Sequence, residues 1–140
     1  MNRHRLRQLL LYGTFIIEFY DANELPDRFA DILDDDLIYE DMSVEPISPE
    51  DHQFVTVRYT DLLKHLSDID QLITERVTEW KITRIGKVEL AAIRLAVYEM
   101  NFDPDVPKKV SINEAVLLAK EFGGGSSGSF VNGALSRIIK

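Results

Sequence analysis

Three arginines stand at alternate positions near the start of the chain, where they suit the binding of phosphate. Arg3, Arg5 and Arg7 are accompanied by His4, and no acidic residue occurs before position 18. Cations in the first turns of a helix oppose the helix dipole, so these side chains contribute little to the helix itself. Guanidinium groups bind phosphate oxygens strongly, and a nucleic-acid backbone is the obvious source of phosphate. Arg3 and Arg7 are predicted to share one helix face, with Arg5 on another; an ordinary basic terminus is the alternative.

An aromatic residue, Phe130, follows a stretch made entirely of glycine and serine near the other end of the chain. This stretch, residues 123–129, is predicted to be a flexible turn that leads into a last helix over 130–139. An aromatic ring at a helix start offers a stacking face to an unpaired base, and free N–H groups there bind phosphate. A phenylalanine buried in the core is the alternative interpretation.

Two charged residues near position 88 are further candidates for contact with RNA. Lys87 and Glu89 stand near the start of a predicted helix and are expected to be exposed. A carboxylate accepts hydrogen bonds from the amino groups of bases, so Glu89 is compatible with RNA binding in spite of its charge.

Patterns for catalysis, metal binding and nucleotide binding are absent from the sequence. The three histidines lack the spacing of a metal site, and there is no cysteine for a thiolate site or a disulfide. The stretch 123–129 has no Lys-Ser/Thr pair and follows a predicted helix instead of a strand, so it is not a phosphate loop. The run Asp34–Asp36 is predicted to be a solvated acidic loop and not a cation site. The sequence therefore predicts a protein without enzymatic activity, metal ion or cofactor.

The composition is that of one globular domain over residues 1–140, with 45% hydrophobic residues. The net charge of −8 is unevenly distributed: it is +3 over residues 1–17, −12 over 18–51 and +1 over 52–140. The negative net charge of the whole chain therefore does not exclude a nucleic-acid partner, because the acidic residues are concentrated in one segment. The apolar run Leu9–Ile17 lacks a cleavage site, and no run reaches the roughly 20 residues of a membrane span, so a cytoplasmic protein is predicted.

The spacing of apolar residues predicts an all-α protein of about seven helices, in a compact bundle with an N-terminal helical subdomain. The expected helices cover residues 3–20, 26–33, 49–66, 68–80, 84–102, 112–122 and 130–139, with loop over 34–45. The helix over 84–102 is apolar on most sides and is expected to be central. Trp80 is expected in the core.

Two polar features are assigned structural roles. Arg94 lies in the most apolar helix and is predicted to be buried, with Glu99 or Glu114 as its partner. Ser111 and Glu114 are predicted to form a capping box at the start of the helix over 112–122.

One pattern runs almost continuously over residues 80–135. It consists of Trp80–Glu89, Ala92–Glu99, Asp105–Val110, Ile112–Val116, Ala119–Gly123, Ser127 and Phe130–Gly133. In this order and spacing it strongly resembles the NusB family of bacterial transcription antitermination factors. The first 79 residues resemble the family less closely, although Arg3, Arg5 and Arg7 fall where members carry arginines. Phe15 falls where a tyrosine is usual.

The resemblance implies a two-part all-helical fold and a non-enzymatic factor that binds the single-stranded boxA element of ribosomal RNA leaders. It implies pairing with the ribosomal protein NusE and entry into the RNA polymerase elongation complex, and some members form homodimers. Where members often carry an acid and a base, this chain has Ser126 and Ser129. Together, the residues and the resemblance give a predicted RNA-binding set of Arg3, Arg5, Arg7, Phe15, Lys87, Glu89 and Phe130.

Two other functions stay open on the sequence. The first is a helical protein–protein adaptor without RNA binding. The second is a non-catalytic RNA-binding partner of an rRNA methyltransferase, because the same helical domain is found attached to RNA cytosine methyltransferases.

Overall fold

The computed structural model describes residues 1–139 and divides the chain into two compact units, Met1–Asp61 and the part from Leu62 onward. Eight α-helices and two 3₁₀ turns make up this described part, which contains no strand. The predicted all-α class is confirmed, with one helix more than expected. Among residues 1–139, no helix is both long enough and apolar enough to cross a membrane.

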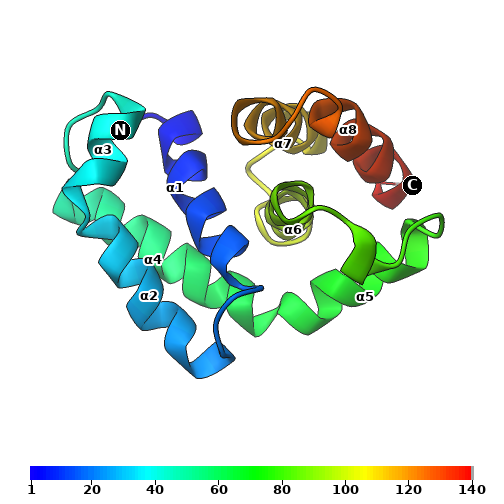
Figure 1. Cartoon of the computed structure of the whole chain (residues 1–140), viewed down its shortest axis with the longest axis horizontal. Helices are drawn as coiled ribbons and strands as arrows, with labels where there is room; N and C mark the ends of the chain where they lie inside the picture. Colours follow the sequence, from blue (N-terminus) through cyan, green and yellow to red (C-terminus); the bar gives the residue numbers. More distant parts are fainter. Residues whose placement is uncertain (140) are drawn as a thin grey trace. The chain divides into compact units, whose positions relative to one another are not determined.

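The N-terminal unit contains α1 (Arg3–Ile16), α2 (Leu25–Leu33), α3 (Asp36–Met42) and most of α4 (Pro49–Lys64) (Figure 1). Three of these helices meet at Gly13 of α1, where the rings of Phe29 and Tyr59 pack with centroids 4.3 Å apart. The Tyr59 hydroxyl donates to the Gly13 carbonyl oxygen at 2.7 Å, and burial raises the pKa of Tyr59. A Cβ at Gly13 would lie 2.7–2.8 Å from the two rings, so glycine is needed for this close approach.

Two predictions for the N-terminal unit are wrong. The first helix ends at Ile16 instead of residue 20, and the expected loop over 34–45 contains α3. The Asp35 side chain caps α3 by accepting from the Leu37 N–H at 3.0 Å. Tyr39 and Met42 are buried, so the helix has an inner face that the surrounding acidic residues obscured in the sequence.

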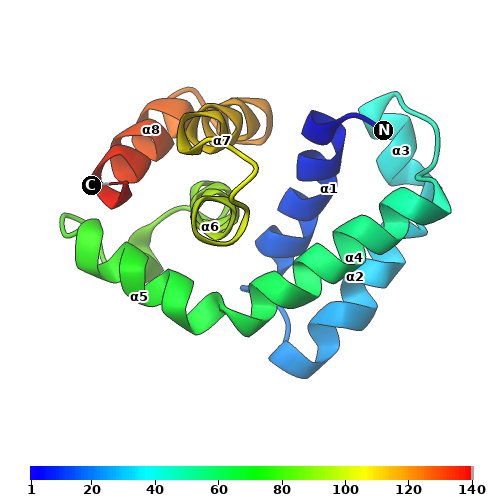
Figure 2. The ribbon, with the colours of Figure 1, turned by 180° about the vertical axis from the view of Figure 1, so that it is seen from behind.

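The C-terminal unit is built around α6 (Lys87–Phe102). It also contains α5 (Leu66–Arg76), α7 (Lys108–Phe122) and α8 (Ser127–Ile138). Figures 1 and 2 show α6 end-on, with α7 and α8 on one side of it and α5 on the other, and it packs against all three. Every residue from Leu90 to Glu99 is buried, which confirms the prediction of a central helix.

Two polar pairs fix the helices around α6. Arg94 is buried as predicted, and its Nε and Nη2 donate to the two carboxylate oxygens of Asp70 on α5 at 2.8 and 2.9 Å. The Ser111 hydroxyl donates to the Glu99 carboxylate at 3.0 Å. The predicted capping box at Ser111 is wrong, because α7 already begins at Lys108 and Ser111 lies inside it.

Candidate nucleic-acid interface

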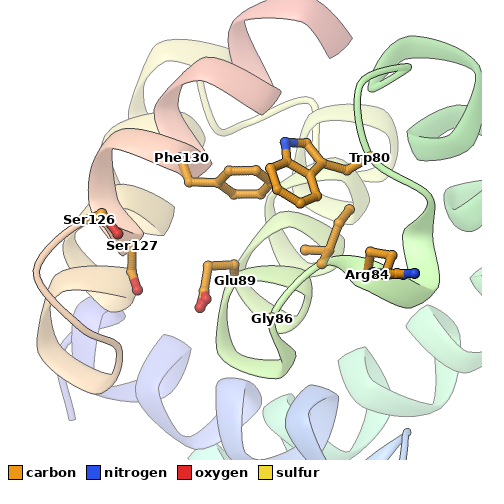
Figure 3. A pocket seen from close by; sticks show the side chains of 8 residues that line it. Trp80, Arg84, Gly86, Glu89, Ser126, Ser127 and Phe130 are labelled. Carbon is orange, nitrogen blue, oxygen red and sulfur yellow. The ribbon is translucent and has the colours of Figure 1, made fainter.

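A pocket of about 280 Å³ lies in the C-terminal unit, where the segment leading into α6 meets the start of α8 (Figure 3). We call it the Glu89 pocket. It is lined by Trp80, Arg84, Ile85, Gly86, Glu89, Ser126, Ser127 and Phe130. The structure therefore brings together Glu89 and Phe130, two predicted RNA contacts that are 41 positions apart in the sequence.

Trp80 and Phe130 form the aromatic wall of this pocket. Their ring centroids are 6.3 Å apart and their planes are inclined by 76°, an edge-to-face arrangement (Figure 3). Trp80 is 52% exposed, so the prediction that it lies in the core is wrong. The reason is that α5 ends at Arg76, and the helical spacing that had placed Trp80 on an inner face does not continue past that residue.

Phe130 is half-buried and lies in the first turn of α8, not at its first residue. The helix begins at Ser127, and the Phe130 N–H donates to the Ser126 carbonyl oxygen at 3.1 Å. A Cβ at Gly128 would lie 2.8 Å from the Lys120 side chain, so the first turn of α8 packs tightly on α7. This packing explains why α8 starts three residues earlier than glycine and serine propensities predict.

The Glu89 carboxylate is held over Gly86 at the start of α6. A Cβ built on Gly86 would lie 2.5 and 2.7 Å from the two carboxylate oxygens of Glu89. The carboxylate can therefore occupy this position only because residue 86 has no side chain. Figure 3 shows it below the two rings, on the side of Ser127. Glu89 lies in the first turn of α6, where the helix dipole stabilises a negative charge. The pocket thus offers a hydrogen-bond acceptor beneath an aromatic wall.

Arg84 supplies the positive charge of the pocket. It is exposed, and its guanidinium makes no hydrogen bond or ion pair within residues 1–139. Nothing in the sequence singles out Arg84, because neither charge nor spacing distinguishes it from Lys81 or Lys87. Lys87 is exposed at the start of α6 but is not among the residues that line the pocket.

The N-terminal arginines differ in exposure. Arg3 is exposed, with its guanidinium carbon 5.0 Å from the centroid of the Phe54 ring, whereas Arg5 is half-buried and donates to Gln8 at 3.0 Å. Arg7 is only 8% exposed. The expected common face of Arg3 and Arg7 is therefore exposed only at Arg3, because every residue from position 6 to 11 is buried.

Phe15, the remaining residue of the predicted set, lies on α1 of the N-terminal unit. It is half-buried, and its ring centroid is 5.2 Å from that of Phe19, which is 55% exposed. The two rings form a small aromatic pair at the end of the helix.

Comparison with known proteins gives consistent matches over the whole chain. The sequence model of the NusB family matches residues 4–140. The transcription antitermination protein NusB of Agathobacter rectalis is 42% identical over 138 residues and that of Lachnoclostridium phytofermentans 41% over 139, with 99% of each chain covered in both cases. The solved structure of T. maritima NusB matches with a TM-score of 0.82 and 31% identity, over 99% of this chain and 90% of that one.

Proposed function

The chain belongs to the NusB family, and from that premise we propose that it is a non-catalytic transcription antitermination factor that binds single-stranded RNA of the boxA type. The names of its relatives support the role in antitermination. The proposal of RNA binding is carried by the Glu89 pocket.

The Glu89 pocket combines three groups that suit an unpaired base. Single-stranded RNA is recognised by stacking of its splayed bases on aromatic rings and by hydrogen bonds to their edges. Trp80 and Phe130 supply the rings. An ionised carboxylate such as that of Glu89 can accept hydrogen bonds but cannot donate them, so it favours a base edge that carries an amino group. The exposed Arg84 guanidinium is suited to a backbone phosphate.

Further phosphate contacts are proposed for the most exposed cations of the predicted set, Arg3 and Lys87. The half-buried Arg5 and Phe15 have less surface to offer a strand. Arg7 is buried, and we assign it no direct contact.

The proposed partners are the ribosomal protein NusE and the elongating RNA polymerase in the bacterial cytoplasm. A factor that holds both RNA and NusE links two separate binding events in one complex. The second event then takes place at a high effective concentration, so two weak contacts give a strong assembly.

A titration with labelled RNA tests this function. A boxA-type single strand is expected to bind at least about tenfold more tightly than a scrambled strand of the same composition, a difference of roughly 1.4 kcal/mol. The affinity is expected to rise when NusE is present and to fall with added salt. Equal affinity for the two strands, with and without NusE, would contradict RNA recognition and favour a protein–protein adaptor.

A further inference from the structure

A second hollow adjoins the same aromatic pair. It has a volume of about 200 Å³, and we call it the Gly133 hollow. It is lined by Val77, Glu79, Trp80, Ser129, Phe130, Gly133, Ala134 and Arg137. Trp80 and Phe130 are the two residues that line both this hollow and the Glu89 pocket, so we treat the ring pair as the partition between two adjoining spaces.

We propose that the Gly133 hollow binds the nucleotide next to the one in the Glu89 pocket, so that Trp80 and Phe130 separate two consecutive bases of one RNA strand. This inference rests on the proposed function and extends it. It adds Trp80, Gly133 and Arg137 to the RNA-binding surface.

The angle between the two ring planes supports the binding of two bases at this site instead of one. Because the ring planes are 76° apart, one flat base cannot lie parallel to both. Stacking on an aromatic face is sequence-tolerant and stabilises each base that finds such a face. With 52% of its surface exposed, Trp80 leaves a large part of the indole available for a base of its own.

Gly133 has no structural reason to be glycine. It lies inside α8, where glycine is less favourable than alanine by roughly 0.5–1 kcal/mol. No glycine in residues 1–139 has a positive φ, and a Cβ built on Gly133 meets no atom within 4 Å beyond its chain neighbours and the adjacent backbone of α8. Gly13 and Gly128, in contrast, face side-chain atoms within 3 Å of such a Cβ. The missing side chain at Gly133 therefore leaves open space beside the hollow, which a bound base can use.

Each of the two spaces is lined by one arginine and one glutamate. Arg84 lines the Glu89 pocket, and Arg137 lines the Gly133 hollow. Arg137 is paired with Glu79, but both side chains are about half exposed, and surface ion pairs of this kind contribute little to stability. A strand that crosses the partition thus has a guanidinium near each nucleotide, which favours RNA over an apolar protein segment as the occupant.

Filling the hollow from Gly133 tests the inference. Gly133→Leu is expected to weaken binding of a boxA-type oligonucleotide by about tenfold, in the range of one lost stacking contact, and Gly133→Ala by less. Asn132→Leu is the matched control, because Asn132 is exposed on the same helix and lines neither space. Thermal unfolding should show that Gly133→Ala is at least as stable as the wild-type chain, since alanine favours the helix.

The outcomes separate this inference from the function on which it rests. Suppose that the wild-type chain prefers boxA RNA and that the Gly133→Leu variant binds this RNA as tightly as the Asn132→Leu variant does. The second nucleotide site is then refuted, and the proposed function stands. If Gly133→Leu weakens binding of NusE and leaves RNA binding unchanged, the hollow belongs to a protein partner and the inference fails. If the wild-type chain does not prefer boxA RNA, both fail.

Abasic substitutions along the oligonucleotide give a second readout. Two consecutive positions are expected to lose affinity when their base is removed, and Gly133→Leu should make one of these two insensitive. A single sensitive position in the wild-type complex would overturn the inference.

Discussion

Replacing Phe130 with alanine is expected to weaken the binding of boxA-type RNA by about 1–3 kcal/mol, roughly 5- to 150-fold. The ring lines both the Glu89 pocket and the Gly133 hollow, and it holds its edge-to-face contact with Trp80. Its removal therefore takes away a stacking face and also frees the indole to move. Fluorescence anisotropy of a labelled oligonucleotide measures the change.

Phe130→Leu and Phe130→Tyr separate stacking from packing. Phe130 is half-buried, so alanine also removes apolar contacts that stabilise the fold. Leucine restores most of these contacts without an aromatic face, and tyrosine keeps the face. If Phe130 stacks on a base, we expect weak RNA binding with leucine and near-normal binding with tyrosine. If leucine binds RNA as well as phenylalanine, the ring has a packing role only.

Replacing Asp70 with alanine is expected to lower the free energy of unfolding by about 2–4 kcal/mol, because it removes a bidentate partner from a buried guanidinium. The Arg94 side chain is 5% exposed and Asp70 is 29% exposed. This partial exposure places the expected loss somewhat below that of a fully buried pair. Urea unfolding followed by tryptophan fluorescence suits the measurement, since Trp80 is the sole tryptophan of the chain and lies in the C-terminal unit.

Two variants control the Asp70 experiment. Glu75→Ala removes an exposed carboxylate from the same helix and is expected to change stability by no more than about 0.5 kcal/mol. The double variant Asp70→Leu with Arg94→Leu should recover part of the loss, because it removes the buried guanidinium together with its Asp70 partner. An Asp70→Ala chain as stable as the Glu75→Ala chain would show that the ion pair is not a structural element.

The central helix could be predicted from the sequence because its signal is local. The stretch around Arg94 is apolar on most sides, and such a helix is stable only when neighbours surround it. The partner Asp70 lies on another helix, 24 residues earlier, and local spacing does not reveal which carboxylate the fold brings close. The sequence therefore predicts that Arg94 is buried, but it indicates Glu99 or Glu114 as the partner and does not identify Asp70.

The candidate site was predicted only in part, for a related reason. Glu89 and Phe130 were identified, and the structure places them in one pocket. Trp80 was assigned to the core because apolar spacing gives no indication that α5 ends four residues before it. Gly133 has no side chain, and only the open space around it in the folded chain points to the role that we propose for it.

Photocrosslinking of a boxA-type oligonucleotide shows directly whether RNA lies against Trp80 and Phe130. Single 4-thiouridine substitutions along the strand, followed by mass spectrometry of the digested complex, identify the residues that touch each base. We expect crosslinks from adjacent nucleotides to peptides that contain Trp80 and Phe130, with none from a scrambled strand under the same conditions. Crosslinks that all fall outside the residues of the Glu89 pocket and the Gly133 hollow would contradict this expectation.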